Sequence, residues 1–337
     1  MTTLLEARYR AVLRLLPAYY RREREEEMVE TYLGDLDRDT QDQSRPTLGE
    51  VASIAALAVR SRLGAAGAPR RYVVLGSGAR LFALAAVLLL AASAVVAPIL
   101  QLTWSFTRSG TERQLLLSDF TGHGVLAGTV AVAQWILPLG WTVAYFALLH
   151  DRRRLARTGA LVAALPTLWP LLRPLAGETA AFEPAFALTL ALLAWLPASV
   201  LCAAHHRDAP PARLPAGTPG LVFMAACVLT GASLVLLPTA NDLVWGPANC
   251  FVVGALGWLL WSARRADRAA PGGTLALAVL GLLLLAARVA ALYPWIRLPE
   301  AAPYTGGALA QTAALTVLTL VLTLYGAREL MTRRATR

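Results

Sequence analysis

Three charged residues lie within or beside long apolar stretches, where a charge is costly and usually has a function. Arg173 and Arg288 each interrupt an apolar run, and Asp242 lies between two others. Because a guanidinium group binds phosphate or carboxylate through paired hydrogen bonds, the two arginines would suit a cavity for an anionic ligand such as a lipid phosphate. Asp242 would then be a counter-ion. The alternative interpretation is that each arginine extends its side chain to the membrane surface.

Other residue types that carry chemistry are sparse. His205, His206 and Asp208 adjoin Arg207 and two prolines, a pattern more typical of a solvated loop than of a metal site. No HExxH, GxSxG or phosphate-loop motif occurs, and no Asp or Glu lies in the core of a predicted membrane span. We therefore predict no enzymatic activity, no metal and no cofactor.

The three cysteines are far apart in the sequence. Cys202, Cys227 and Cys250 each lie within or beside an apolar stretch. This spacing fits neither a disulfide framework nor a zinc site. We expect each cysteine to behave as a small buried hydrophobic residue.

The elements that must position these residues are membrane helices. Of the 337 residues, 57% are hydrophobic and only 15% are charged, which excludes an ordinary soluble surface. A span needs about 20 apolar residues. Eight stretches meet this length: 81–107, 120–150, 158–176, 184–204, 220–238, 244–263, 274–293 and 307–325. The third contains several prolines, which predict a kinked or broken helix.

Arginines indicate how these spans are oriented. The connections and tail on one side hold 18 arginines and those on the other side hold three. Because arginine-rich loops stay in the cytosol, we predict that both termini are cytosolic. The net charge of +10 is thus a topology signal, and we predict no nucleic-acid partner. Basic residues that are all arginine, with abundant Ala and Leu, are typical of a high-GC bacterial genome, so we expect a bacterial cytoplasmic membrane.

The first 64 residues show a different pattern, that of three amphipathic helices. Leu5, Tyr9, Val12 and Leu16 share one helical face before Pro17. A second helix is predicted over about 19–36. The third begins with Thr47 and Glu50 in the spacing of a capping box and ends near Gly64, a plausible C-terminal cap. A bundle this small is marginal alone and is expected to contact a partner or a second copy of the chain.

Together these patterns predict an all-α, polytopic membrane protein. We expect residues 1–79 to form a cytosolic helical module and linker. Residues 80–327 would form an eight-helix transmembrane domain, and residues 328–337 a basic cytosolic tail.

Part of the module carries a family resemblance. The segments Tyr9-Arg10, Leu13–Pro17, Tyr20-Arg21 and Glu26-Glu27-Met28 resemble the helical module of HAAS-type bacterial membrane proteins, which are associated with PadR-type regulators. A similar module precedes some macrolide-exporter-like permeases. The resemblance covers about 60 residues and implies assembly or regulation through protein contacts. It makes Tyr20, Arg21, Glu27 and Met28 candidates for contact with a partner.

Three functions remain open from the sequence. The first is a non-enzymatic envelope sensor or regulator that signals through the N-terminal helices to a cytosolic regulator or through a homo-oligomer. The alternative is a transporter or a permease subunit of an export system. An enzyme acting on lipid-linked substrates comes third. Membrane lipid is an expected partner in all three.

Overall fold

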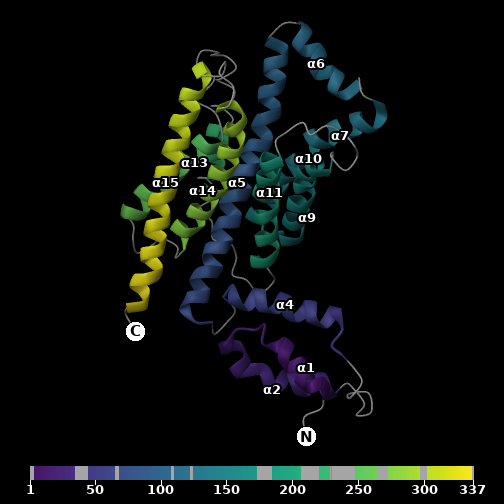
Figure 1. Ribbon diagram of the computed structural model, residues 1–337, viewed down its shortest axis with the longest axis vertical. Helices are drawn as coiled ribbons and strands as arrows, with labels where there is room; N and C mark the ends of the chain where they lie inside the picture. The colour runs from purple at the N-terminus through teal and green to yellow at the C-terminus, as the bar shows by residue number, and fades with distance from the viewer. Residues whose placement is uncertain are drawn as a thin grey trace. The chain divides into compact units, whose positions relative to one another are not determined.

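The structure is a computed structural model in which every described element is a helix (Figure 1). It describes residues 4–34, 45–64, 68–107, 110–121, 124–172, 184–205, 220–227, 229, 247–264, 272–296 and 302–335. The helices before residue 150 are α1 (Leu4–Leu13), α2 (Ala18–Gly34), α4 (Leu48–Arg62), α5 (Arg70–Thr107), α6 (Gly110–Thr121), α7 (Gly124–Ile136), η1 (Leu137–Leu139) and α8 (Gly140–Leu149). Those after it are α9 (Arg153–Ala164), η2 (Leu165–Leu168), α10 (Trp169–Leu172), α11 (Pro184–Ala204), α13 (Pro247–Arg264), α14 (Gly273–Ile296) and α15 (Ala302–Ala335).

The chain divides into two compact units. The first comprises Met1–Ala79 with Ala203–Ala209, and the second comprises Arg80–Cys202 with Pro210–Arg337. Helix α5 begins in the first unit and continues into the second.

Helices α1, α2 and α4 of the first unit form what we call the N-terminal module. Their buried side chains make one apolar cluster, composed of Tyr9, Leu13, Leu16, Val29, Ile54 and Ala58. The predicted apolar face of the first helix is confirmed in that Leu5, Tyr9 and Leu16 are buried, although α1 ends at Leu13, one turn before Pro17. A three-helix arrangement is what three amphipathic stripes need in order to cover one another.

Both ends of α4 follow the sequence signals. The Thr47 hydroxyl accepts a hydrogen bond from the Glu50 backbone N–H at 3.3 Å, and the Glu50 carboxylate accepts one from the Thr47 N–H at 2.7 Å. This is the predicted capping box. Gly64 follows the helix with a φ of 90°, a left-handed conformation that glycine adopts without a Cβ penalty.

Six helices of the described residues are long and apolar enough to cross a membrane, as in a multi-pass membrane protein. They are Arg70–Thr103, Gly128–Leu149, Arg153–Leu172, Pro184–Ala204, Gly273–Pro294 and Gly306–Arg328. Each overlaps one of the eight predicted spans. The predicted span 244–263 coincides with the 18-residue α13, which is not among the six because Asn249 and Arg264 lower its mean hydropathy. Most of the span 220–238 lies outside the described residues, so the count of eight stays a prediction.

Two of these spans are irregular at prolines. The 3-10 segment η2 interrupts the third predicted span at Pro166, in agreement with the expected break. A second 3-10 segment, η1, interrupts the preceding span at Pro138, which the sequence analysis did not predict. Proline lacks the N–H that would continue the helical hydrogen-bond ladder, so both breaks have the same physical cause.

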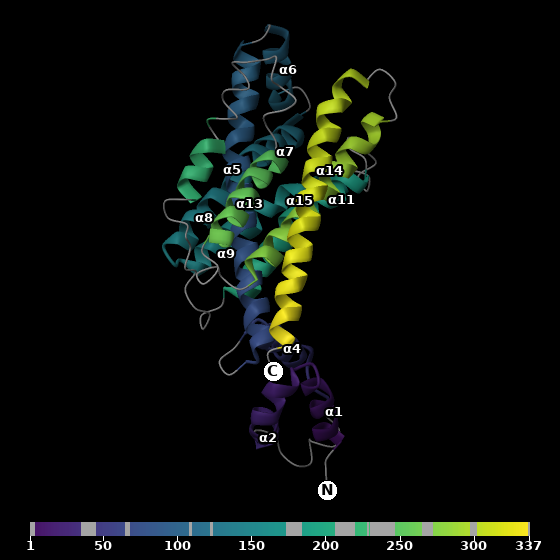
Figure 2. The ribbon, with the colours of Figure 1, turned by 90° about the vertical axis from the view of Figure 1, so that its left-hand side faces the viewer.

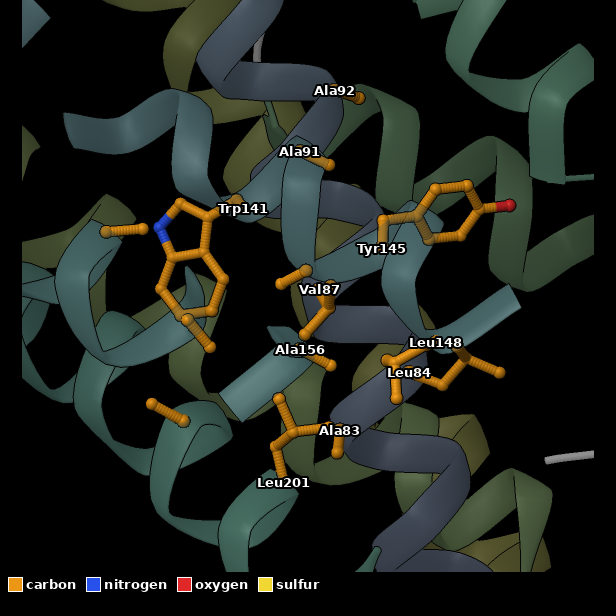
Figure 3. Close-up of a cluster of buried hydrophobic side chains, with 14 of the residues drawn as sticks. Ala83, Leu84, Val87, Ala91, Ala92, Trp141, Tyr145, Leu148, Ala156 and Leu201 are labelled. Atoms are coloured by element: carbon orange, nitrogen blue, oxygen red, sulfur yellow. The ribbon is translucent and has the colours of Figure 1, made fainter. Parts of the chain in front are cut away.

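Within the second unit, α5 contributes to two apolar clusters. Residues Ala83, Val87 and Ala91 pack with residues of α8, α9 and α11, including Trp141, Ala156 and Leu201 (Figure 3). Phe82, Ala86 and Leu89 pack instead with residues of α13, α14 and α15. Helices α14 and α15 lie side by side along much of their length (Figures 1 and 2). The α5 helix therefore joins two groups of membrane helices.

Candidate functional site

An apolar cavity of about 260 Å³ lies within the second unit. Its walls come from α5, α8, the helical segment 220–227, α13 and α14. Most of the lining is aliphatic or aromatic, with Leu84, Leu88, Phe223, Phe251 and Leu277 as examples. The volume is slightly below the roughly 300–1,000 Å³ of sites for drug-sized ligands, so the cavity suits a single ring or part of an acyl or isoprenoid chain.

Glycines bring large aromatic side chains to the edge of this cavity. The indole ring of Trp258 lies directly over Gly273, so a Cβ at that position would overlap the ring. The hydroxyl of Tyr145 likewise lies against Gly220, at the start of the segment 220–227. All four residues line the cavity. Larger residues at either glycine would displace an aromatic wall.

The lining carries few polar groups, and one of them is without a partner. The indole Nε1 of Trp258 is buried and has no hydrogen-bond partner among the described residues. A buried indole N–H normally donates to an acceptor, because leaving it unpaired costs about 1–3 kcal/mol. Because this Nε1 is itself shielded, the lining offers a ligand mainly apolar contacts.

Two cysteines lie at or near the wall of the cavity. Cys250 of α13 lines the cavity and packs against the apolar cluster that contains Cys227 of the segment 220–227. Cys227 is buried, Cys250 is half-buried, and both are free thiols. Their apolar packing agrees with the expectation of small hydrophobic residues, although Cys250 is only half-buried. No local sequence signal reveals the pair, because its members are on separate helices and share no short motif.

Arg288, predicted to line a ligand cavity, is paired within the protein. Its Nη2 donates to Oε1 of Gln311 at 2.8 Å, so α14 and α15 are joined by this hydrogen bond. Its Nε is buried with no partner among the described residues. Arg288 does not line the cavity described above. The other members of the predicted anion site, Arg173 and Asp242, lie outside the described residues, so that site stays a prediction.

The predicted partner-contact residues all lie on α2 of the N-terminal module. Tyr20 and Met28 are half-buried and pack against the module core. Arg21 is also half-buried, whereas Glu27 is exposed. Of the four, Glu27 is therefore the most accessible to a partner, and Tyr20 and Met28 also support the fold of the module.

Polar contacts join the module helices to one another. Arg10 of α1 donates from Nη1 and Nη2 to the two carboxylate oxygens of Glu26, each at 2.8 Å. This hydrogen bonding lowers the pKa of Glu26. The Tyr32 hydroxyl donates to Glu50 Oε2 at 3.1 Å, and the Tyr19 hydroxyl donates to the Ser61 carbonyl at 2.7 Å. These contacts fix the relative positions of α1, α2 and α4.

Comparisons of the chain with protein-family models, with curated proteins and with solved structures found no match. The resemblance of the first helices to the HAAS-type module therefore stays a prediction.

Proposed function

We propose that the protein is a non-enzymatic sensor or regulator of the bacterial cytoplasmic membrane, with both termini in the cytosol. Its membrane helices would respond to a ligand or to the state of the membrane. The N-terminal module would transmit that response to a cytosolic regulator protein.

The observation that carries this proposal is that the N-terminal module has its own apolar core and a highly charged, exposed helix face. Leu13 and Leu16 are buried in the module, and the interhelical hydrogen bonds of Arg10 and Tyr32 tie its helices together. The outer face of α2 remains exposed, with Arg22, Glu23, Arg24, Glu27 and Glu30. A charged helix face of this kind favours selective recognition of a complementary protein surface.

Cross-linking and purification of the full-length protein from its native membranes tests the proposal. Reversing two exposed charges, Glu27→Arg with Glu30→Arg, is expected to abolish capture of a regulator. Arg14→Glu reverses an exposed charge in the turn after α1 and is the matched control, expected to leave capture intact. Protease resistance of the module shows that each variant is folded.

Two results together would overturn the sensor proposal. One is that purification of the wild-type protein recovers no regulator. The other is that deletion of the gene leaves the transcriptome unchanged. Fusion of a topology reporter to the C-terminus provides a separate test of the orientation, and a signal outside the cytosol would contradict it.

The second candidate function is transport, and the two proline breaks favour it. Segments η1 and η2 contact each other, so the helical ladders of adjacent spans are interrupted at one place. Many transporters form their substrate sites from such discontinuous helices. An ATPase gene beside this one would support an export system, whereas a PadR-type regulator gene would support the sensor.

A further inference from the structure

Four arginines gather where α4 ends and α5 begins. Arg60 and Arg62 lie in the last turn of α4, and Arg70 and Arg71 are the first two residues of α5. All four are exposed. We call residues 59–64 and 69–76 together the α4–α5 corner, which lies wholly within the first compact unit.

Two glycines bring these helix ends into contact. A Cβ at Gly64 would lie 3.2 Å from the Tyr72 carbonyl oxygen, and a Cβ at Gly76 would overlap the Leu63 carbonyl. The end of α4 therefore rests directly against the first two turns of α5 (Figure 1). Because each of the four arginines lies within about one helix turn of this contact, their positive charges share one corner of the unit.

No carboxylate offsets this charge. The sequence from residue 51 to residue 111 contains no Asp or Glu. Among the described residues, none of the four arginines is in an ion pair. Arg62 donates to the Ala58 carbonyl and Arg71 donates to the Tyr72 hydroxyl, each at 3.3 Å, and both acceptors are neutral. The corner therefore presents uncompensated positive charge.

The length of α5 brings this corner to the surface of a bilayer. The helix contains the candidate span Arg70–Thr103 and has 38 residues, so it is about 57 Å long. A bilayer with its headgroups is only about 40–45 Å thick. The charge-free run 81–107 is by itself long enough to cross the hydrocarbon core. The charged start of α5 then lies in or just outside a headgroup layer.

Exposed apolar side chains accompany the arginines. Val59 of α4 is 46% exposed, and Val73 and Leu75 of α5 are 42% and 43% exposed. Arginines with exposed apolar side chains are typical of contact with the boundary between headgroups and acyl chains. There, apolar groups enter the acyl region while guanidinium groups bind phosphate through paired hydrogen bonds.

We propose that the α4–α5 corner binds the headgroups of anionic phospholipids and thereby anchors the N-terminal module to the bilayer surface. The arginines attract the negatively charged lipids, and the exposed valines and leucine hold the corner at the acyl boundary. This inference goes beyond the proposed function, because it applies to a sensor and to a transporter alike.

Tyr19 connects the same corner to α2. Its hydroxyl donates to the Ser61 carbonyl at 2.7 Å, and its ring centroid lies 5.4 Å from that of Tyr72. Lipid contact at the corner therefore restrains α2 as well as α4 and α5.

The test measures lipid contact at the corner of the full-length protein in phosphatidylcholine nanodiscs. A bimane label is attached through Val59→Cys in a chain whose native cysteines are replaced by alanine. Nitroxide-labelled phosphatidylglycerol or phosphatidylcholine, with the same nitroxide near the headgroup, is the quencher. At equal mole fraction we expect phosphatidylglycerol to give a quenching slope about fivefold higher, the equivalent of one arginine near an anionic surface. Added salt should reduce this preference.

Variants separate the charge of the corner from its fold. Glutamine at all four positions is expected to make the two lipids quench equally: Arg60→Gln, Arg62→Gln, Arg70→Gln and Arg71→Gln. Lysine at the same positions retains the charge and is expected to retain the preference. Arg22→Gln with Arg24→Gln is the matched control, since these exposed arginines of α2 alternate with Glu23 and Glu25. It is expected to leave the preference unchanged.

Four results would each overturn the proposal. In the chain with all four arginines, these are equal quenching by the two lipids and quenching by neither. The latter would place the corner away from the bilayer and leave its charge for an acidic protein surface. The others are a preference that survives in the glutamine variant and a preference lost equally in the glutamine and lysine variants. Regulator capture is measured separately, so failure here would leave the sensor proposal standing.

Discussion

The N-terminal module and the α8–α9 hairpin pack their helices by different means. In the module, leucines and tyrosines form the core and hydrogen bonds such as Arg10 to Glu26 join the helices. Between α8 and α9 the contacts come from small residues, among them Ala144, Ala160 and Gly159. Water drives apolar side chains together, whereas lipid is as apolar as leucine, so close packing must hold membrane helices together. The same chain thus follows two packing rules.

The largest loss of stability is expected from a cavity in the core of the N-terminal module. Leu13 is fully buried, so Leu13→Ala is expected to cost about 2–5 kcal/mol. A small core rarely supplies more than about 3–5 kcal/mol, so the module should unfold while the membrane helices remain intact. Leu15→Ala alters an exposed leucine two residues away and is expected to have little effect. Hydrogen exchange of the full-length protein measures the module and the α8–α9 hairpin at once. Faster exchange in α8 and α9 of the Leu13→Ala variant would show that the hairpin depends on the module for its stability.

A methyl group added at the contact between α8 and α9 tests the close packing of these membrane helices. A Cβ at position 140 would lie 2.7 Å from the carbonyl oxygen of Gly159, whereas one at Gly257 of α13 would meet open space. Gly140→Ala is therefore expected to cost about 1–3 kcal/mol through forced separation of α8 and α9. Gly257→Ala makes the same chemical change without the contact.

The readout for these two glycine variants is the midpoint of thermal unfolding in detergent. We expect a lower midpoint for Gly140→Ala alone, with the protease resistance of the module unchanged. Equal midpoints for the two variants would mean that the close backbone approach does not limit stability.

Sequence reasoning succeeded where the signal is local. The buried face of α1, the capping box of Thr47 and Glu50, and the left-handed Gly64 each depend on residues within a few positions of one another. The break at Pro166 is local in the same sense. In all these cases the physical cause lies within one short segment of the chain.

Apart from the break at Pro138, the unpredicted features depend on contacts between helices. Gly140 and Gly159 meet across a hairpin, and Cys227 and Cys250 join one apolar cluster from two separate helices. No periodicity of a single helix encodes which residue of a second helix it will meet. The Trp258 indole over Gly273 is hidden for the same reason, although its two helices are neighbours in the sequence.

A smaller effect is expected from the N-terminal cap of α4. Thr47→Ala removes the hydroxyl that accepts from the Glu50 N–H, and caps of this kind contribute about 0.5–2 kcal/mol. Thr31→Ala is the control, since its hydroxyl donates to the Glu27 carbonyl within α2 and caps no helix start. Hydrogen exchange in the first turn of α4 should accelerate only for the Thr47 variant. Acceleration in both would indicate general loosening of the module.

The smallest change in stability at neutral pH is expected at Tyr32. It is restricted to the module and depends on the ionisation of the Tyr32 hydroxyl. Burial, followed by the hydrogen bond to Glu50, raises the pKa of Tyr32 to about 12 from 10.0. The folded state holds the Tyr32 proton more tightly than the unfolded state does. The resulting contribution of Tyr32 to the free energy of unfolding is therefore complete below pH 10 and is lost as pH rises through 12.

Tyr32→Phe removes both the hydroxyl and its titration. We expect it to cost about 1 kcal/mol at neutral pH and then to reduce the alkaline loss of module stability, measured as cleavage by an alkaline-stable protease. Some alkaline loss should remain, since burial also raises the pKa values of Tyr9 and Tyr19. An unchanged alkaline profile in Tyr32→Phe would assign the transition to those two tyrosines. Ala144, Ala160 and Gly159 carry no titrating group, so their contacts have no counterpart of this pH dependence.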